Sequence, residues 1–225
     1  MGPVLFTIYI NDLETNVSSN LLKFADDTKV WGKVDTIEDR NLLQKDLDIL
    51  GDWSSLNGMP FNVNKCKVLH VGRKNVSADY TLMGVTIPMA TEEKDLGVFF
   101  SNKFKPSFNC NKASKAANKI VGLIRRNITN KVSEGMLILY KTVVRPILDY
   151  CIQVWRPFTK KDIKILESVQ KRYTKMIDGC KDKSYEQRLR KLNLTTLKDR
   201  HYRADMIQVF RILNDNNDIY PENFL

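Results

Sequence analysis

The feature that most constrains the fold is a change of hydrophobic pattern near residue 104. Before it, apolar residues alternate with polar ones in short runs that glycine and proline interrupt, with helical patterns between them. Beyond it, apolar residues recur only three and four positions apart. Alternation predicts strands, whereas spacings of three and four predict amphipathic helices. The sequence therefore predicts an α+β part over residues 1–104, followed by an all-helical part over residues 105–225.

The predicted elements of the first part are two helices and several strands. A helix ends within residues 2–13, and a second covers residues 37–58, where three leucines and Trp53 share one face. Between them, residues 21–31 alternate on either side of two acids, which predicts a hairpin. Alternation also predicts a strand over residues 60–72. Two further extended segments cover residues 79–89 and 94–101, with Gly84, Pro88 and Gly97 as turn signals.

The second part contains four amphipathic segments. Residues 112–126 place alanine, valine and isoleucine on one stripe, and residues 133–155 form one long helix or a helix kinked at Pro146. Residues 160–177 set an apolar stripe opposite four lysines, and residues 196–213 form the last amphipathic helix. This arrangement predicts a small all-α domain.

Charge is divided unequally between the two parts. Residues 1–100 carry 10 Lys and Arg against 14 Asp and Glu, net −4, whereas residues 101–225 carry 26 against 12, net +14. A basic surface attracts polyanions, because binding releases the counterions condensed on the phosphates. The pattern therefore favours a nucleic acid as partner, and the alternative is a solvated lysine-rich helical surface.

Composition excludes export and membrane insertion. The four cysteines are scattered, without a CxxC pair, and no secretory signal begins the chain, so we expect an intracellular protein, nuclear or cytoplasmic, with buried thiols. No apolar run reaches 18 residues, so no membrane span is predicted. Zinc is a weak alternative, because Cys66 and His70 are four apart on a predicted strand and the other ligand types are remote.

The segment KFADDT, residues 23–28, sets two adjacent carboxylates between apolar neighbours. Asp26 and Asp27 repel one another, so they either sit in water at a turn or hold a cation. Magnesium prefers carboxylate oxygens, and phosphoryl transfer uses paired divalent cations that stabilise the attacking and leaving oxygens. Taken alone, the pair leaves both interpretations open.

Five blocks in order resemble a known family. They are GPVLFTIYINDL, KFADDT, NGMPFNVNKCKVLHVG, EEKDLGVFF and LYKTVVRPILDYCIQVW, and the resemblance extends over nearly the whole length of the chain. In this order they resemble reverse transcriptases of non-LTR (LINE-type) retrotransposons, close to the chicken-repeat and jockey-like groups. The resemblance implies an RNA-directed DNA polymerase that uses Mg²⁺, an RNA template and a DNA primer, with no small-molecule cofactor. It makes residues 1–104 a partial palm, an antiparallel sheet with helices, and residues 105–225 a thumb-like helical region.

The resemblance also implies roles for individual residues. Asp26 matches the metal-ligand aspartate of the catalytic hairpin and Asp27 its partner. Lys65 matches a lysine proposed to protonate the pyrophosphate leaving group, although Lys67 or a plain surface lysine would fit the same block. The turn at Leu96 and Gly97 resembles the segment that positions the primer 3′ end. Basic residues that could grip the template–primer duplex are Lys112, Lys115, Lys119, Arg125 and Arg126.

Parts of the family pattern are absent from the sequence. The third palm aspartate, the fingers and the Gln-Gly that usually precedes the first block are missing. We therefore expect a truncated retrotransposon reading frame without polymerase activity by itself. Two alternatives remain: a nucleic-acid-binding module that has lost its chemistry, and an inert relic with an incomplete palm sheet.

Two further residue types carry simpler predictions. His201 is surrounded by basic residues, which predicts a place on the polar face of its helix. The three tryptophans, Trp31, Trp53 and Trp155, fall within apolar patterns and are predicted to lie in the core, with Trp155 partly exposed at a helix end as the alternative.

Overall fold

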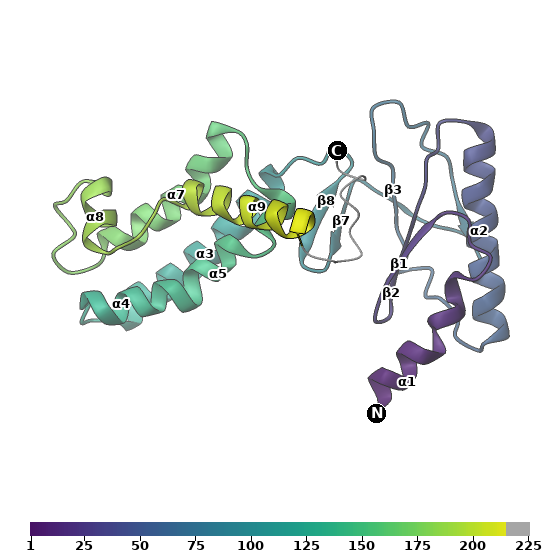
Figure 1. Cartoon of the computed structure of the whole chain (residues 1–225), viewed down its shortest axis with the longest axis horizontal. Coiled ribbons are helices and arrows are strands. Elements are labelled where there is room, and N and C mark those ends of the chain that lie inside the picture. Colours follow the sequence, from purple (N-terminus) through teal and green to yellow (C-terminus); the bar gives the residue numbers. More distant parts are fainter. Residues whose placement is uncertain (215–225) are drawn as a thin grey trace. The chain divides into compact units, whose positions relative to one another are not determined.

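The computed structural model describes residues 1–214, and the elements are labelled in Figure 1. The described chain forms two compact units. One comprises residues 1–95 together with 100–104, and the other comprises residues 96–99 together with those from 105 onward. The last residues of the predicted helical region, 215–225, lie outside the described part. The fold class is α+β, as the sequence predicts.

Two helices and a hairpin begin the first unit, and all three were predicted. The long helix α2 starts with a capping box, in which the Thr36 side chain accepts from the Asp39 amide and the Asp39 carboxylate accepts from the Thr36 amide. Figure 1 shows α2 beside the strands of this unit. The elements are α1 Gly2–Tyr9, the 3₁₀ turn η1 Asn11–Glu14, β1 Asn20–Phe24, β2 Asp27–Trp31 and α2 Ile37–Leu56.

The remaining strands of the first part of the chain are short and form separate pairs. Strand β1 pairs with β2, β3 runs parallel to β6, β4 pairs with β5, and β7 pairs with β8. The extended segments predicted at 79–89 and 94–101 are confirmed as these pairs. Their bounds are β3 Val68–Leu69, β4 Thr81–Leu82, β5 Val85–Thr86, β6 Met89–Ala90, β7 Glu92–Asp95 and β8 Val98–Ser101.

The strand predicted over residues 60–72 is wrong except at β3. Residues 63–65 form a turn, in which the amides of Lys65 and Cys66 both donate to the carbonyl of Asn62. Asparagine and the preceding Pro60 favour turns over a sheet ladder, and this preference outweighs the alternating pattern.

One cluster of buried side chains supports the first unit. Tyr80, Leu82 and Ile87, from β4 and its neighbours, are at most 6% exposed. The α2 residues Leu43 and Leu47 pack against this cluster, as the predicted apolar face of the helix requires.

From residue 105 to 214 the second unit contains helices and the loops between them, as predicted. Two of its amphipathic helices, α3 and α7, pack together through their apolar faces. The short helix α8 was not predicted. The elements are α3 Ser107–Asn127, α4 Ser133–Leu139, the π-helical turn η2 Tyr140–Val144, α5 Arg145–Asp149, α6 Ile152–Trp155, α7 Lys160–Lys175, α8 Tyr185–Lys191 and α9 Leu197–Asn214.

The segment 133–155 is neither one helix nor a helix with a single kink. Its hydrogen-bond pattern widens into the π-helical turn η2 immediately before Pro146, which has no amide hydrogen to donate. The chain then breaks at Cys151, whose φ of 49° is left-handed, before α6 begins. The π-helical turn accommodates Pro146, which cannot donate an amide hydrogen bond. The second break, at Cys151, depends on tertiary contacts that the local sequence does not show.

Several buried polar side chains of the helical core are hydrogen-bonded to side chains or to backbone carbonyls. Tyr173 is fully buried and donates to the carbonyl oxygen of Met136 at 2.7 Å, and Tyr140 donates to the side chain of Gln170. Gln170 in turn donates to the carbonyl of Thr195 at 2.9 Å. Burial raises the pKa of Tyr173 to about 12, so its hydroxyl stays a donor across the physiological range.

The tryptophans behave differently from one another. Trp155 is buried as predicted, with its indole nitrogen donating to the carbonyl of Tyr150 at 2.9 Å, and Trp53 is half-buried. Trp31 is 50% exposed, so its predicted place in the core is wrong. It belongs to the outer face of a two-stranded hairpin, where no second layer among the described residues covers it. None of the helices in residues 1–214 combines the length and apolar character that a membrane crossing requires.

Candidate active site

The predicted hairpin with Asp26 and Asp27 at its tip is confirmed. Strands β1 and β2 are antiparallel, and the last pair, Phe24 with Asp27, leaves a two-residue loop of Ala25 and Asp26. Ala25 has a φ of 51°, in the left-handed region that costs an L-residue about 1–2 kcal/mol. The tight loop thus requires a strained backbone immediately before the two acids.

Both carboxylates of this tip are exposed. They are adjacent, oxygen-bearing and open to solvent, which fits the ligand preference of magnesium. Two adjacent acids are not a complete two-metal site, and within residues 1–214 no group of three or more His, Cys, Asp or Glu side chains could hold a metal ion. The donor chemistry therefore fits the metal, whereas the number of donors falls short.

The base of the hairpin is fixed to α2 by a buried carboxylate. Asp46 accepts hydrogen bonds from the amides of Ser18 at 3.0 Å and Ser19 at 2.7 Å, just before β1. Burial alone would raise the pKa of Asp46, but these hydrogen bonds outweigh it and hold the pKa below its usual value. Lys23 adds a second link by donating to the carbonyl of Asn11 at 2.9 Å. The tip therefore projects from a supported base.

A salt bridge joins the hairpin to β7. Lys29, on β2, pairs with Asp95, the last residue of β7. The residue after Asp95 is Leu96, the first residue of the turn predicted to position a primer end. The ion pair therefore connects the acidic hairpin with the strand that leads into that turn.

One face of the hairpin exposes three large apolar side chains. Leu22, Phe24 and Trp31 alternate onto this face and are 50–60% exposed. A two-stranded sheet cannot bury both of its faces without a second layer, so these three side chains face solvent.

Lys65 lies in the turn described above rather than on a strand. Its side chain is exposed, as is that of Lys67. Within the described residues, no hydrogen bond or ion pair joins Lys65 to either aspartate of the hairpin. The structure thus leaves both lysines on the surface of the first unit and does not bring Lys65 into contact with the acids.

The turn at Leu96 and Gly97 is a two-residue connection between β7 and β8. Both residues have positive φ, 43° and 85°, which a two-residue hairpin turn of this kind requires. Tyr150 donates from its hydroxyl to the carbonyl of Leu96 at 2.7 Å, and its ring lies 3.0 Å from where a Cβ on Gly97 would be. Only glycine fits this second position.

Four of the five predicted basic residues of α3 form one exposed stripe. At 100° per residue, Lys112, Lys115, Lys119 and Arg126 fall within an arc of roughly 60° along about 21 Å of helix. Arg125 is also exposed but lies about 100° round the helix from Arg126, outside the stripe. Lys112 lies over the rings of Phe99 and Phe108, at 5.4 and 5.2 Å, which anchors one end of the stripe.

A second basic stripe lies on α7. Lys161, Lys164, Arg172 and Lys175 are exposed and fall within an arc of roughly 80°. Arg172 donates to the side-chain oxygen of Asn118 on α3 at 2.9 Å, so the surfaces of the two helices are continuous at this point. The sequence predicted these lysines only as the polar face of a helix, because periodicity does not reveal which helices pack side by side.

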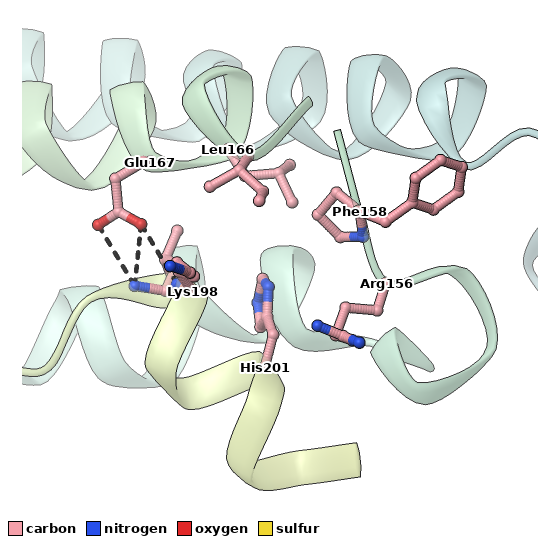
Figure 2. Close-up of a pocket in the computed structure, with 9 residues that line it drawn as sticks. Arg156, Phe158, Leu166, Glu167, Lys198 and His201 are labelled. Carbon is pink, nitrogen blue, oxygen red and sulfur yellow. Dashed lines mark hydrogen bonds between the residues drawn. The ribbon is translucent and has the colours of Figure 1, made fainter. Parts of the chain in front are cut away.

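The helical unit also contains a cavity of about 210 Å³. Figure 2 shows Leu166 and Phe158 on its apolar side, with Arg156 and His201 facing the same space. Glu167 accepts hydrogen bonds from the amides of Leu197 at 3.1 Å and Lys198 at 3.3 Å. The N-terminus of a helix attracts an anion, and at α9 the Glu167 carboxylate already occupies that position.

His201 was predicted on the polar face of its helix, and this prediction is wrong. It is 1% exposed, and its Nε2 lies 3.1 Å from the Asp149 carboxylate. The partner is 52 residues away in the sequence, so helix periodicity could not reveal it. No predicted site residue contacts this pair.

Comparison with known proteins provides one relative. The chain is 25% identical to the RNA-directed DNA polymerase from mobile element jockey of Drosophila melanogaster, over 80% of its own length. This similarity confirms the predicted relationship to non-LTR reverse transcriptases. The chain spans about a fifth of the length of that relative, 21%. No family model and no solved structure matches the chain.

The acidic hairpin and the basic helical surface lie on different units of the described chain. The carboxylates of the hairpin are the kind of ligand that magnesium prefers, and the charge of the helical surface is the kind that attracts a polyanion.

Proposed function

We propose that this chain is the part of an RNA-directed DNA polymerase that contains the catalytic hairpin of the palm and a thumb-like helical region. The observation that carries the proposal is the pair of exposed carboxylates at the tip of a two-residue hairpin, in a chain similar to a jockey polymerase over most of its length. Residues 1–104 then correspond to part of the palm, and residues 105–225 to the thumb and the region downstream of it.

In this proposal Asp26 and Asp27 hold Mg²⁺. The metal would supply charge stabilisation to the phosphates of an incoming nucleotide and to the leaving pyrophosphate. The residues themselves contribute hard oxygen ligands on a rigid hairpin, and Lys65, or Lys67 beside it, is the proposed proton donor to the leaving group. An adjacent pair is too few for two metals, so we propose that a third carboxylate from outside the described residues completes the site.

The proposal predicts that the isolated chain does not extend a primer. The test is primer extension on an RNA template with Mg²⁺, using the parent chain and its Asp26→Asn variant. We expect no DNA synthesis from either protein. Synthesis by the parent chain that the Asp26→Asn variant lacks would overturn the proposed inactivity and support the proposed metal ligands. Synthesis by both would overturn the assignment of Asp26.

A second candidate function is non-catalytic binding of a nucleic acid duplex. It is favoured by the two basic stripes, whose helices pack together and are joined by Arg172 and Asn118. Each phosphate that a lysine or arginine neutralises releases condensed counterions, so affinity should fall steeply as salt is raised. Contacts of this kind fix the position of a duplex without reading its sequence.

The test compares two variants of equal charge in a gel-shift titration against an RNA–DNA duplex. In the first, the α3 stripe is neutralised by changing Lys112, Lys115, Lys119 and Arg126 to Ala. In the control, four exposed basic residues of the first unit are changed instead, namely Lys45, Arg73, Lys74 and Lys94. Because each lost phosphate contact reduces the slope of log K against log salt by about 0.9, the first variant should lose about 3–4 units of slope. Equal losses in both variants would show that net charge, and not the α3 surface, governs binding.

A further inference from the structure

The turn at Leu96 and Gly97 is held in a strained shape by the helical unit. Leu96 has a φ of 43°, a region that L-residues other than Asn and Asp rarely occupy, and its side chain is 43% exposed. A residue in such a conformation persists only where its surroundings determine it, and such residues cluster at functional sites. The contacts that determine this turn come from two side chains, Tyr150 and Asn109.

Tyr150 fixes the turn from one side. Its hydroxyl donates to the carbonyl of Leu96, and its ring occupies the space that a side chain on Gly97 would need. The backbone of Tyr150 is itself held at both ends, because its amide donates to Pro146 at 3.0 Å and its carbonyl accepts from the indole of buried Trp155 at 2.9 Å. The backbone that carries the ring is thus fixed at both ends, although the side chain itself is 54% exposed.

Asn109 fixes the strand that leaves the turn. Its amide oxygen accepts from the backbone amide of Phe99 at 2.9 Å, and its amide nitrogen donates to the Phe99 carbonyl at 2.6 Å. In an antiparallel sheet, a neighbouring strand would make the same two hydrogen bonds to the amide and carbonyl of one residue. The Asn109 side chain therefore takes the place of a strand at this edge of β8. Asn109 is only 7% exposed, which shields both bonds from water.

The same contacts place the turn beside the basic stripe of α3. Asn109 and Lys112 lie one turn apart on α3, and Lys112 lies over Phe99 and Phe108, which meet edge to face at 5.0 Å. The first cation of the stripe therefore rests on the strand that Asn109 holds. A duplex bound along the stripe would therefore pass close to this strand and to the turn before it.

We propose that Tyr150 and Asn109 are positioning residues that hold the Leu96–Gly97 turn in the shape needed to contact the recessed 3′ end of a strand whose phosphates the α3 stripe binds. This inference rests on the proposed nucleic-acid function and adds to it the residues that determine recognition of a strand end. Neither residue needs to touch the nucleic acid. Both act through Leu96, Gly97 and Phe99.

The experiment measures the preference of the full chain for a recessed 3′ end. Affinities are determined for an RNA–DNA duplex with a recessed DNA 3′ end and for a blunt duplex of the same paired length. Fluorescence of a 2-aminopurine at the 3′ terminus reports contact with that base. The variants are Tyr150→Phe, which removes one hydroxyl and keeps the ring, and Asn109→Leu, which removes both bonds to Phe99, keeps a similar side-chain size and adds no charge. The control is Tyr9→Phe, which removes a matched hydroxyl-to-carbonyl bond, that to Asn57, in the first unit.

We expect the parent chain and Tyr9→Phe to prefer the recessed end and to change the terminal fluorescence. Tyr150→Phe and Asn109→Leu should lower that preference about fivefold, the effect of losing a hydrogen bond, with blunt-duplex affinity unchanged. Tyr150→Phe and Tyr9→Phe should lower the thermal midpoint by a similar small amount, so a loss of stability alone does not account for the changed preference. Unchanged preference in both variants, or equal losses on both duplexes, would overturn the inference. A parent chain that binds both duplexes equally would overturn it and leave duplex binding intact, whereas one that binds neither would overturn the proposed function as well.

Discussion

The imidazole of His201 lies 3.1 Å from Oδ1 of Asp149, and the histidine is almost completely buried. A carboxylate only accepts hydrogen bonds, so Nε2 of His201 carries the proton that points at Asp149. The other oxygen of Asp149 accepts from Arg200 at 2.6 Å and lies 3.8 Å from Arg145. One carboxylate thus joins α5 to α9. Burial would raise the pKa of Asp149, but its hydrogen bonds to His201 and Arg200 lower it below its usual value.

Replacing Asp149 by Asn should destabilise the chain in a pH-dependent way. The folded pKa of Asp149 is below its unfolded value of about 3.9, so its contribution is fully present above that pH and is lost as the pH falls through the folded pKa. We expect the free energy of unfolding to fall by roughly 2–4 kcal/mol at pH 7, because Arg200 and Arg145 lose their carboxylate partner. Urea unfolding at pH 7 and at pH 3 measures it. A difference between parent and variant that did not shrink in acid would contradict this account.

Much of the fold could be predicted from local sequence signals. The acidic hairpin follows from alternation around a polar turn, and α2 follows from its capping residues and its leucine face. Contacts between distant segments could not be predicted in this way. His201 contacts Asp149, and Leu96 contacts Tyr150, although more than 50 residues separate the members of each pair. Helix periodicity and turn preferences do not reveal such contacts.

The candidate site shows the same division between local and distant information. The turn at Lys65 follows from nearby asparagines that outweigh a pattern of alternation, so it was open to prediction. The exposure of Trp31 depends on which layers cover the hairpin, which local sequence does not state. The alignment of Lys112, Lys115 and Lys119 on one face was predictable, whereas the continuity of this stripe with that of α7 depends on the packing of α7 against α3.

The four cysteines should divide into two classes of reactivity. Cys110 and Cys180 are fully buried, whereas Cys66 and Cys151 are half-buried, and all four are free thiols. Burial and the nearby Asp162 raise the pKa of Cys110 to about 12, so almost no thiolate forms at pH 8. Titration of the native chain with an aromatic disulfide reagent should therefore modify Cys66 and Cys151 only. Peptide mapping identifies the sites, and rapid modification of Cys110 without denaturant would contradict the packing described for α3.

A methyl group on Gly97 should cost more than one on Gly84. Both glycines have positive φ, 85° and 75°, so alanine at either position is strained by about 1–2 kcal/mol. Only at Gly97 would the new Cβ also meet the ring of Tyr150, at 3.0 Å, and disturb the bond to Leu96. Gly97→Ala should therefore lower the free energy of unfolding by roughly 1 kcal/mol more than Gly84→Ala. Parallel urea titrations measure both, and equal losses would show that Tyr150 does not confine the turn.

Replacing Ala25 by Gly should stabilise the acidic hairpin. Ala25 has a left-handed φ of 51°, where alanine costs about 1–2 kcal/mol and glycine costs nothing sterically. The greater freedom of glycine in the unfolded chain offsets about 0.4–1 kcal/mol of that gain. We therefore expect a net increase of about 0.5–1 kcal/mol in the free energy of unfolding. Ala116→Gly is the matched control, because Ala116 is exposed within α3 and the same change there should destabilise by about 1 kcal/mol. Opposite signs for the two variants in one urea series would establish that the residue before Asp26 is strained. A loss of stability in both would show that the loop does not need a left-handed residue there.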